Sequence, residues 1–320
     1  MTQVFYSQTE AAAALDGAVV AIGNFDGMHI GHQAIFEAAR SQADTQGLTM
    51  VALTFEPHPS AFFRPDDAPA RLSPPSYKFE LMQRYGADAV VALTFDESLA
   101  GLSPEAFVES VLVDSLKAKH VVVGEDFRFG KQRAGDTESL ESLGKPRGMT
   151  CEVAEFVTWQ GAAVSSTRIR ASVEEGDLAQ AQQMLGRPFR LFGEVVHGDA
   201  RGRKLGFPTA NMKPVQMAMP PVGVYATSLA RAGQPHWRGI TNIGRRPTFG
   251  GGDVTIETFV LDESVDEELE LYGDDVELDL YRRVRGEKRF DSPAELIAQI
   301  RRDIEEVSAF FDKEGLYGRR

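Results

Sequence analysis

Among its 320 residues the sequence has one cysteine, two tryptophans and no long hydrophobic run. The single cysteine, Cys151, excludes a disulfide framework within the chain and a four-cysteine zinc site, and it favours a reducing compartment, the cytoplasm. The longest apolar stretches, such as Ala18–Ile22, are far shorter than the roughly 20 residues of a membrane-spanning helix. The N-terminus MTQVFYSQTE lacks the basic start and apolar core of a signal peptide, so we expect no membrane partner.

Basic residues are also scarce. The chain has 34 Lys plus Arg against 47 Asp plus Glu, a net charge of −13, and such a surface repels the phosphate backbone of nucleic acids. Residues 1–185 carry 14 basic and 25 acidic side chains (net −11), whereas residues 186–320 carry 20 and 22 (net −2). At roughly 100 to 200 residues per domain, the length and this contrast predict two domains, 1–185 and 186–320, and no nucleic-acid partner.

The first domain alternates short β-branched apolar runs with segments of helical spacing. We expect strands at 19–22, 50–55, 89–93, 120–123 and 150–153, and helices at 32–43, 76–84 and 104–116. This alternation predicts an α/β domain with a doubly wound parallel sheet. Ligands bind such sheets beyond the carboxyl ends of the strands.

After Gly186 the strands follow one another without intervening helices, at 192–196, 223–230, 237–243, 254–261 and 276–281. This pattern predicts an antiparallel β-barrel. The sequence Ser292-Pro-Ala-Glu295 is a capping box that begins a C-terminal helix. One face of that helix is apolar and is expected to pack on the barrel: Leu296, Ile300, Ile304, Val307 and Phe311.

The first candidate site is GNFDGMHIGH, residues 23–32, where the first strand meets a helix. Glycines let backbone N–H groups approach phosphate oxygens, and the helix N-terminus favours negative charge. His29 and His32 can donate to a reacting phosphate, so the motif suits a triphosphate and a pyrophosphate leaving group. Taken alone, HxGH equally fits a turn whose histidines cap a helix. The residues nearby do not supply further zinc ligands.

A second motif, VSSTRIR at 164–170, places hydroxyls before arginine at a loop-to-helix junction. Such groups can hold phosphates through charge-assisted hydrogen bonds, although the pattern alone also fits a capped helix with exposed arginines.

The two motifs together resemble the HxGH and ISSTxxR signatures of HIGH-type nucleotidyltransferases. With TFEPHP at 54–59 and VGEDFRFG at 123–130, residues 15–185 resemble the FMN adenylyltransferase module of bacterial FAD synthetases. The resemblance implies that His29, His32 and Arg170 act on ATP phosphates and that Ser166 and Thr167 complete this site. The candidate nucleotide or flavin contacts are Gly23, Asn24, Phe25, Asp26, Gly31 and Asp126.

Other residues near these strand ends have two interpretations. A flavin ring can stack on some of the phenylalanines, or they belong to the core: Phe55, Phe62, Phe63, Phe127 and Phe129. Arg71 and Lys78 either reach phosphates or are solvated.

The barrel begins with GEVVHGDARGRKLGFPTAN, residues 193–211, which contains four glycines and three basic residues. Such a loop can wrap phosphates with its backbone while side chains neutralise them, yet its spacing fits neither a Walker loop nor GxGxxG. The Thr209 hydroxyl and the Asn211 amide suit a magnesium ion bound to a nucleotide.

Glu257 lies in VTIETFV, a strand otherwise suited to burial, and is the candidate base for phosphoryl transfer to an alcohol. Alternation places it on the face of Thr255 and Phe259. An outward-facing glutamate with no catalytic role fits the same pattern.

The PTAN motif at 208–211, the run ITNIGRRPTFG at 240–250 and the IETF strand resemble riboflavin kinase over residues 187–312. The resemblance implies that Thr209 and Asn211 bind Mg²⁺ with ATP and that Glu257 deprotonates the ribityl hydroxyl. Arg285 is then expected near the flavin, and the nucleotide-binding candidates are Gly198, Arg201, Lys204, Gly206 and Pro208.

The two modules in this order resemble the bacterial bifunctional enzymes that convert riboflavin to FMN and FMN to FAD, with ATP and Mg²⁺. Two alternatives stay open at this point: an adenylyltransferase for another phosphorylated vitamin, and a flavin-binding regulator or carrier without turnover. A class I aminoacyl-tRNA synthetase shares the histidine turn, but the acidic charge disfavours it. The sequence does not predict the oligomeric state.

Overall fold

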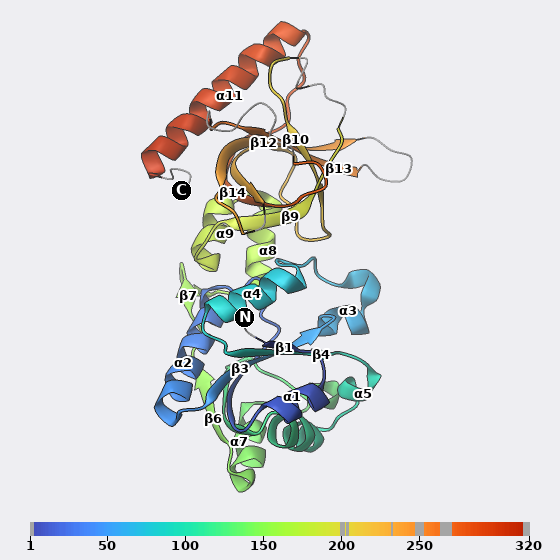
Figure 1. The fold of residues 1–320 in the computed structure, drawn as a ribbon, viewed down its shortest axis with the longest axis vertical. Coiled ribbons are helices and arrows are strands. Elements are labelled where there is room, and N and C mark those ends of the chain that lie inside the picture. The colour runs from blue at the N-terminus through green and yellow to red at the C-terminus, as the bar shows by residue number, and fades with distance from the viewer. Residues whose placement is uncertain are drawn as a thin grey trace. The chain divides into compact units, whose positions relative to one another are not determined.

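The computed structural model describes residues 3–198, 202, 205–231, 233–246, 253–262 and 271–315. The chain divides into two units, Met1–Ser166 and Thr167–Arg320. Figure 1 shows a parallel sheet with helices in the first unit and a barrel in the second.

The first unit is built on a six-stranded parallel sheet with the order β1-β4-β3-β2-β5-β6. All five residues of β2 are buried, as expected where helices cover both faces of a sheet. The five predicted strands are confirmed, slightly lengthened, and β1 is additional: β1 (Gln3–Phe5), β2 (Ala18–Ile22), β3 (Thr49–Glu56), β4 (Ala89–Thr94), β5 (Ala118–Gly124) and β6 (Thr150–Ala154).

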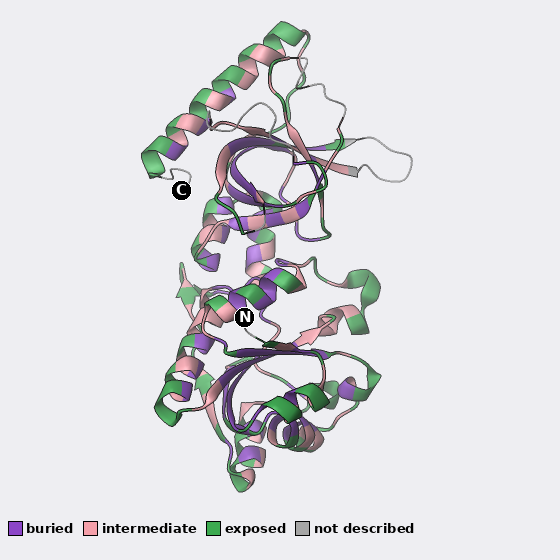
Figure 2. Cartoon of the chain, viewed as in Figure 1, coloured by how far each residue is buried: buried purple, intermediate pink, exposed green. Residues whose placement is uncertain are grey.

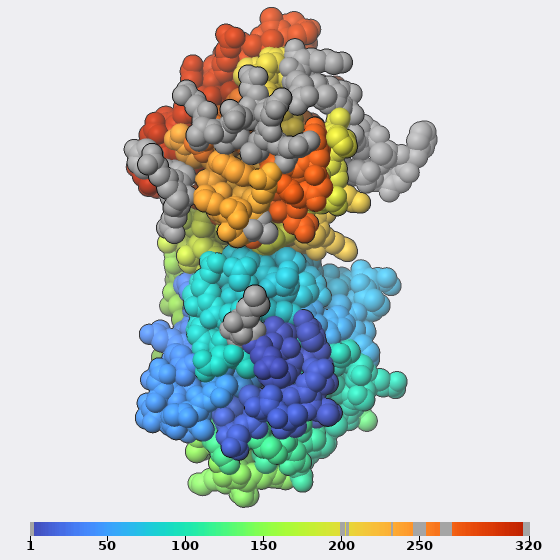
Figure 3. Space-filling model, viewed as in Figure 1, coloured from blue at the N-terminus to red at the C-terminus, as the bar shows by residue number. Residues whose placement is uncertain are grey.

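Helices cover this sheet on both faces. α1 (Gln8–Ala14), α7 (Thr137–Gly144) and the helical segment 104–115 pack on one face, and α2 (Ile30–Gln46) and α4 (Pro75–Arg84) contact the sheet from the other. In Figure 3, α4 (cyan) lies next to the N-terminal segment that contains α1 (dark blue). Short elements complete the unit: α3 (Pro59–Phe63), η1 (Pro65–Asp67), α5 (Glu97–Ala100), η3 (Lys131–Arg133), η4 (Lys145–Arg147), β7 (Thr158–Trp159) and β8 (Ala162–Ala163).

The helix predicted at 104–116 differs from a regular α-helix. Ser103 caps its start, as expected, but only α6 (Pro104–Ala106) is α-helical, and the π-helix η2 (Phe107–Ser115) follows. The Leu116 N–H donates to the carbonyl of Val111, five residues earlier. Apolar spacing alone does not distinguish these two windings, because both bury nearly the same side chains.

The strand order indicates where a ligand of this sheet is expected to bind. From β2 the chain continues to β3 and then β4 on one side, whereas β5 and β6 lie on the other side of β2. The connections leaving β2 and β5 therefore diverge at their carboxyl ends, which is the position where open α/β sheets bind ligands.

The second unit begins with α8 (Ser166–Glu175, its first residue still in unit one) and α9 (Leu178–Leu185), and continues as a closed antiparallel barrel with the order β10-β13-β12-β11-β14-β9. The barrel is confirmed, but β10 is additional: this short strand begins at the end of the glycine-rich segment, where no strand was predicted. The strands are β9 (Phe189–Val196), β10 (Ala210–Pro214), β11 (Gly223–Arg231), β12 (Trp237–Arg246), β13 (Asp253–Val260) and β14 (Asp275–Arg285).

Strand alternation separates the interior of the barrel from its exterior (Figure 2). A chain of buried hydroxyls crosses the strands, with Oγ1 atoms 2.7 Å apart between Thr227 and Thr241 and 2.8 Å apart between Thr241 and Thr258. The C-terminal helix α11 (Pro293–Glu314) is capped by Ser292 as predicted. Its residues Val307 and Phe311 pack on an apolar cluster of barrel side chains.

Candidate active sites

The turn between β2 and α2 holds the two histidines of the first motif. α2 begins at Ile30, two residues earlier than predicted, and His29 is its N-cap. The Nδ1 atom of His29 accepts the backbone N–H of His32 at 3.3 Å, so the neutral ring carries its proton on Nε2. His29 therefore caps the helix, and this bond also fixes the tautomer that it presents.

The two imidazoles stack on each other with centroids 3.6 Å apart and an angle of 16°. Phe25 packs against this pair: its side chain is fully buried, and its ring meets the His32 ring edge-on with centroids 5.2 Å apart. A side chain on Gly23 would begin 2.8 Å from the Phe25 ring, and one on Gly31 would begin 3.2 Å from His29. Phe25 and Gly31 thus lie against the histidine pair, and Gly23 lies against the Phe25 ring.

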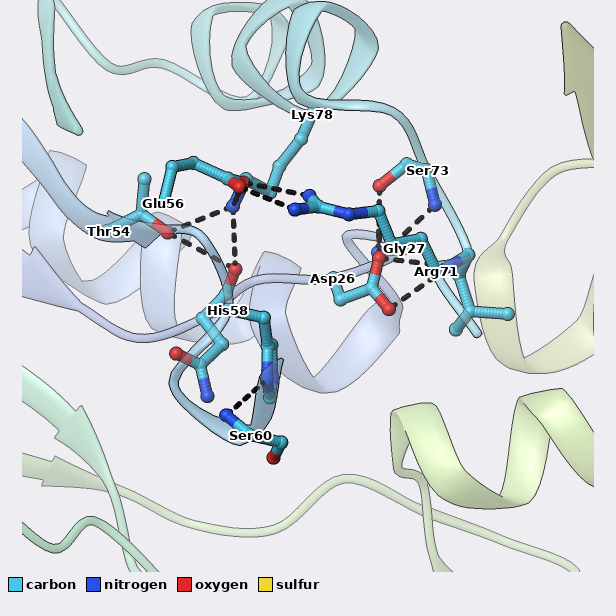
Figure 4. Close-up of polar contacts among 11 residues, drawn as sticks. Asp26, Gly27, Thr54, Glu56, His58, Ser60, Arg71, Ser73 and Lys78 are labelled. Carbon is cyan, nitrogen blue, oxygen red and sulfur yellow. Dashed lines mark hydrogen bonds and ion pairs between the residues drawn. The ribbon is translucent and has the colours of Figure 1, made fainter. Parts of the chain in front are cut away.

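Two residues of this turn have unusual backbone conformations, and hydrogen bonds from residues outside the turn stabilise it. Phe25 and Met28 have φ values of 52° and 40°, which are unfavourable for residues with a side chain. The Asp26 carboxylate, 7% exposed, accepts the backbone N–H groups of Leu72 (3.0 Å) and Ser73 (3.1 Å) and the Ser73 hydroxyl (Figure 4). Asp26 was expected to contact the ligand, but its carboxylate is engaged within the protein.

Next to this turn, Arg71 and Lys78 both bind Glu56 (Figure 4). The buried Lys78 Nζ lies 2.5 Å from Glu56 Oε1, and Arg71 donates to both carboxylate oxygens at 3.2 and 2.8 Å. Burial by itself raises the pKa of Glu56, but the Arg71 hydrogen bonds and the Lys78 charge outweigh it and lower that pKa. The pKa of Lys78 is lowered, with burial as the main cause. Lys78 is therefore not solvated, and both cations already have a carboxylate partner.

Asp126 and Ser166 relate to the turn in different ways. Asp126 is exposed just after β5, the strand that neighbours β2 at the switch point. The Ser166 hydroxyl donates to the backbone carbonyl of Asp26 at 2.9 Å, so the second motif touches the first. Thr167 is exposed and Arg170 is half-buried in the first turns of α8, and both belong to the second unit.

The phenylalanines divide between the two interpretations. Phe129 is buried and packs in the core, stacked with Phe127 at 5.5 Å. Phe62 and Phe63 are 39% and 63% exposed, and both contact Phe95, which the sequence reading did not single out. Phe55 also packs against Phe95 and is only partly exposed. Of the five candidate phenylalanines, the two exposed ones are therefore Phe62 and Phe63 of α3.

The second site is centred on Glu257, in the middle of β13. Ile256 and Thr258 on either side of it are 1% exposed, whereas Glu257 is half-buried on the opposite face, as the alternation predicts. In the ladder Glu257 pairs with Asn211 of β10 on one side and with Asn242 of β12 on the other. Asn242 lies in the run ITNIGRRPTFG, but no spacing or charge pattern in the sequence singles it out.

Two glycines of the described part of the glycine-rich segment lie close to other groups of that segment. A side chain at Gly198 would begin 2.3 Å from the Asn211 carboxamide, and one at Gly202 would begin 2.3 Å from the Phe207 carbonyl oxygen. Asn211 donates to the Thr209 carbonyl at 3.4 Å, and Thr209 is half-buried. The candidates Gly206 and Pro208 are exposed, and Arg201 and Lys204 lie outside the described residues.

Arg285 binds a helix of the protein. Its Nε and Nη2 atoms donate to Asp303 of α11 at 2.9 and 2.8 Å, and its guanidinium lies 5.9 Å from the Phe290 ring centroid. Asp303 is 3% exposed, so this ion pair is largely shielded from solvent. The guanidinium that we expected near the flavin thus joins the end of β14 to α11.

Comparisons with known proteins agree on both halves of the chain. The FAD synthetase family model matches residues 11–168, and the riboflavin kinase family model matches residues 185–311. The curated "Bifunctional riboflavin kinase/FMN adenylyltransferase" of Escherichia coli (strain K12) is 38% identical and is covered to 93%, with 92% of this chain aligned. The proteins of the same name from Pseudomonas fluorescens and Bacillus subtilis (strain 168) are 40% and 35% identical, over 90% and 92% of this chain and 91% and 92% of their own length.

A solved structure from Streptococcus pneumoniae, titled as a macrolide-efflux protein, superposes with a TM-score of 0.86. It is 29% identical and covers 96% of this chain and 99% of its own. In the described part of the chain, none of the helices is both long and apolar enough to cross a membrane. Both family models and the curated relatives therefore lead to one conclusion: this chain belongs to the family of bifunctional riboflavin kinase/FMN adenylyltransferases.

Proposed function

We propose that this chain phosphorylates riboflavin with ATP to give FMN at the Glu257 site, and adenylylates FMN with a second ATP at the histidine turn to give FAD and pyrophosphate. The observation that supports the proposal is that the two candidate motifs lie on two different folds, a parallel sheet and a barrel. The turn after β2 lies at the switch point of the sheet, and Glu257 lies between two asparagines on the barrel.

For the adenylyl step, the FMN phosphate is the nucleophile and needs no general base. It attacks the α-phosphorus of ATP, and pyrophosphate leaves with the negative charge that builds on its oxygens. The Nε2–H of His29, the adjacent His32 ring and the N-terminus of the 17-residue helix α2 favour that charge. Ser166, Thr167 and Arg170 complete this phosphate site, with Asn24 and Asp126 near the nucleotide or flavin.

For the kinase step, Glu257 accepts the proton of the riboflavin 5′-hydroxyl as its oxygen attacks the γ-phosphorus of ATP, and ADP leaves. The hydroxyl and amide oxygens of Thr209 and Asn211 fit Mg²⁺, and the close approach of Gly198 to Asn211 makes a defined cradle for that amide. The ion supplies charge stabilisation to the phosphates when bound. The backbone around Gly198, Gly206 and Pro208, with Arg201 and Lys204, is proposed to surround the nucleotide.

We place the division between the activities near Leu185. The riboflavin kinase match beginning at residue 185 supports this, although the two structural units divide earlier, after Ser166. The intervening helix α9 contacts β9 and β14, so it packs with the barrel. The single cysteine supports a cytoplasmic location.

The decisive experiment incubates the purified chain with riboflavin, ATP and Mg²⁺ and separates the flavins by chromatography. We expect FMN first and then FAD. A His29→Ala/His32→Ala variant should still form FMN but lose FAD formation by about a hundredfold or more. If the wild-type chain forms neither product, the proposed function is wrong; if it forms FMN alone, the assignment of the first domain is wrong.

A further inference from the structure

One short segment, residues 71–78, holds the histidine turn at several points. At its end, Lys78 donates to three oxygens: the backbone carbonyl of Asn24 (3.4 Å), the Thr54 hydroxyl (3.3 Å) and Glu56 (2.5 Å). Thr54, which is fully buried, donates its own hydroxyl proton to the same Asn24 carbonyl at 3.2 Å. An ammonium has three N–H donors, so these contacts use all of them.

The beginning of the segment fixes the next two residues of the turn. Leu72 and Ser73 donate their backbone N–H groups to Asp26, and the Ser73 hydroxyl accepts the backbone N–H of Gly27 at 3.2 Å (Figure 4). Asn24, Asp26 and Gly27 are therefore tied to one segment, and His29 follows two residues later. A turn with two non-glycine residues at positive φ keeps its shape only where its surroundings determine it in this way.

We infer that Lys78 is a positioning residue for adenylyl transfer, which sets the path of the histidine turn by holding the Asn24 carbonyl against the end of β3. This inference rests on the proposed function of the turn. Lys78 is 4% exposed and its donors are used inside the protein, so it acts through the backbone that carries the histidines. A misplacement of about 1 Å in such a group can cost about a hundredfold in rate.

The neighbouring charges allow this role to be separated from simple charge balance. Glu56 is also held by both terminal nitrogens of Arg71, so removing the Lys78 ammonium leaves the carboxylate paired with a cation. The carbonyl of Asn24, in contrast, would lose the Lys78 donor and keep the Thr54 hydroxyl as its partner among the described residues. A variant that removes both charges then tests whether turnover follows the carbonyl contact or the ion pair.

The experiment measures both activities of full-length variants. For Lys78→Met we expect kcat for FAD formation from FMN to fall by about tenfold or more, with KM for ATP and FMN changed by less than about threefold and riboflavin phosphorylation unchanged. Glu56→Gln/Lys78→Met removes the pair and should be as slow as the single variant. The exposed Lys145→Met is the matched control and should retain wild-type rates.

Two results would overturn the inference: an unchanged kcat in Lys78→Met, or recovery of kcat in the double variant, which would make Lys78 only a charge partner of Glu56. If Lys78→Met does not fold, Thr54→Val decides the question, because it removes the other donor to the Asn24 carbonyl and is expected to lower the same kcat. Absence of FAD formation by the wild-type chain would instead refute the proposed function itself.

Discussion

Asn211 of β10 lies directly opposite Glu257 of β13 in the antiparallel ladder of the barrel. Opposite residues in such a pair have their Cβ atoms about 4.5 to 5.5 Å apart. The candidate metal ligand and the candidate base are thus brought together although they are far apart in the sequence. This distance suits a site where a hydroxyl must lie near both a base and a metal-bound phosphate.

Glu257→Gln keeps the size of the side chain and its place in the ladder, but the amide cannot accept the hydroxyl proton. We expect riboflavin phosphorylation to fall by about 10² to 10⁴-fold, while FAD formation from added FMN stays at the wild-type rate. Steady-state assays of each half-reaction measure this. An equal loss of both activities would contradict the separation of the two sites.

Gly198→Ala tests the cradle around Asn211. The added methyl group would begin 2.3 Å from the Asn211 carboxamide, so that side chain must move. Because the change displaces a proposed Mg²⁺ ligand, we expect a loss of about 10 to 100-fold in kinase activity and a higher Mg²⁺ requirement.

A double-mutant cycle provides the control for this prediction. If Gly198→Ala acts by displacing Asn211, combining it with Asn211→Ala should cost little more than Asn211→Ala alone. Additive losses would mean that Gly198 acts through some other contact. Gly273→Ala serves as the comparison, since a side chain there meets nothing within 4 Å and no ligand contact is proposed there, although its φ of +80° adds backbone strain.

The fold was predictable where periodicity is strong and local. The alternation of strands and helices gave the parallel sheet, and the series of β-rich runs gave the barrel. The strand β10 was not predicted, because Ala210–Pro214 is short and follows a glycine-rich loop. Its hydrogen-bonded pairing with β9 and β13 identifies it as a strand. The π-helix of residues 107–115 was predicted as an α-helix, because its apolar pattern fits both windings.

Candidate site residues could be named from the sequence where a motif is contiguous. The histidine pair and the PTAN run were found from the sequence, and the structure adds the contacts between distant segments. Asp26 binds residues 46 and 47 positions later, and Arg285 binds Asp303 on α11. Neither partner can be read from local spacing, because each bond joins segments that are distant in the sequence.

Glu56 should make the first unit sensitive to acid. Its folded pKa lies below the ordinary 4.5, so its contribution to the free energy of unfolding is fully present above that value and is lost as the pH falls through the folded pKa. We expect the wild-type chain to lose more stability between pH 7 and about 3 than Glu56→Gln does.

The positions of the two tryptophans allow the stability of the first unit to be measured separately. In a Trp237→Phe background, Trp159 is the sole tryptophan and lies in the first unit. Its fluorescence during urea unfolding at each pH reports on unfolding of the first unit, which also contains Glu56. The free energy of unfolding is then compared between chains with Glu56 and with Glu56→Gln. If it falls equally with pH in both, the Glu56 carboxylate does not contribute to acid sensitivity.

Cys151 should be a slow nucleophile in the folded chain. Burial on β6, together with the carboxylates of Glu141 and Glu152, raises the pKa of its thiol to about 11, from the ordinary 9.0. At pH 8 the reactive thiolate is then roughly one molecule in a thousand, against roughly one in ten for an unfolded chain. We expect alkylation by iodoacetamide, followed by mass spectrometry, to be about a hundredfold slower in the native protein than in urea, and to accelerate about tenfold for each pH unit up to 10. Equal rates in native and unfolded chains would mean that this thiol is neither shielded from solvent nor affected by the two carboxylates.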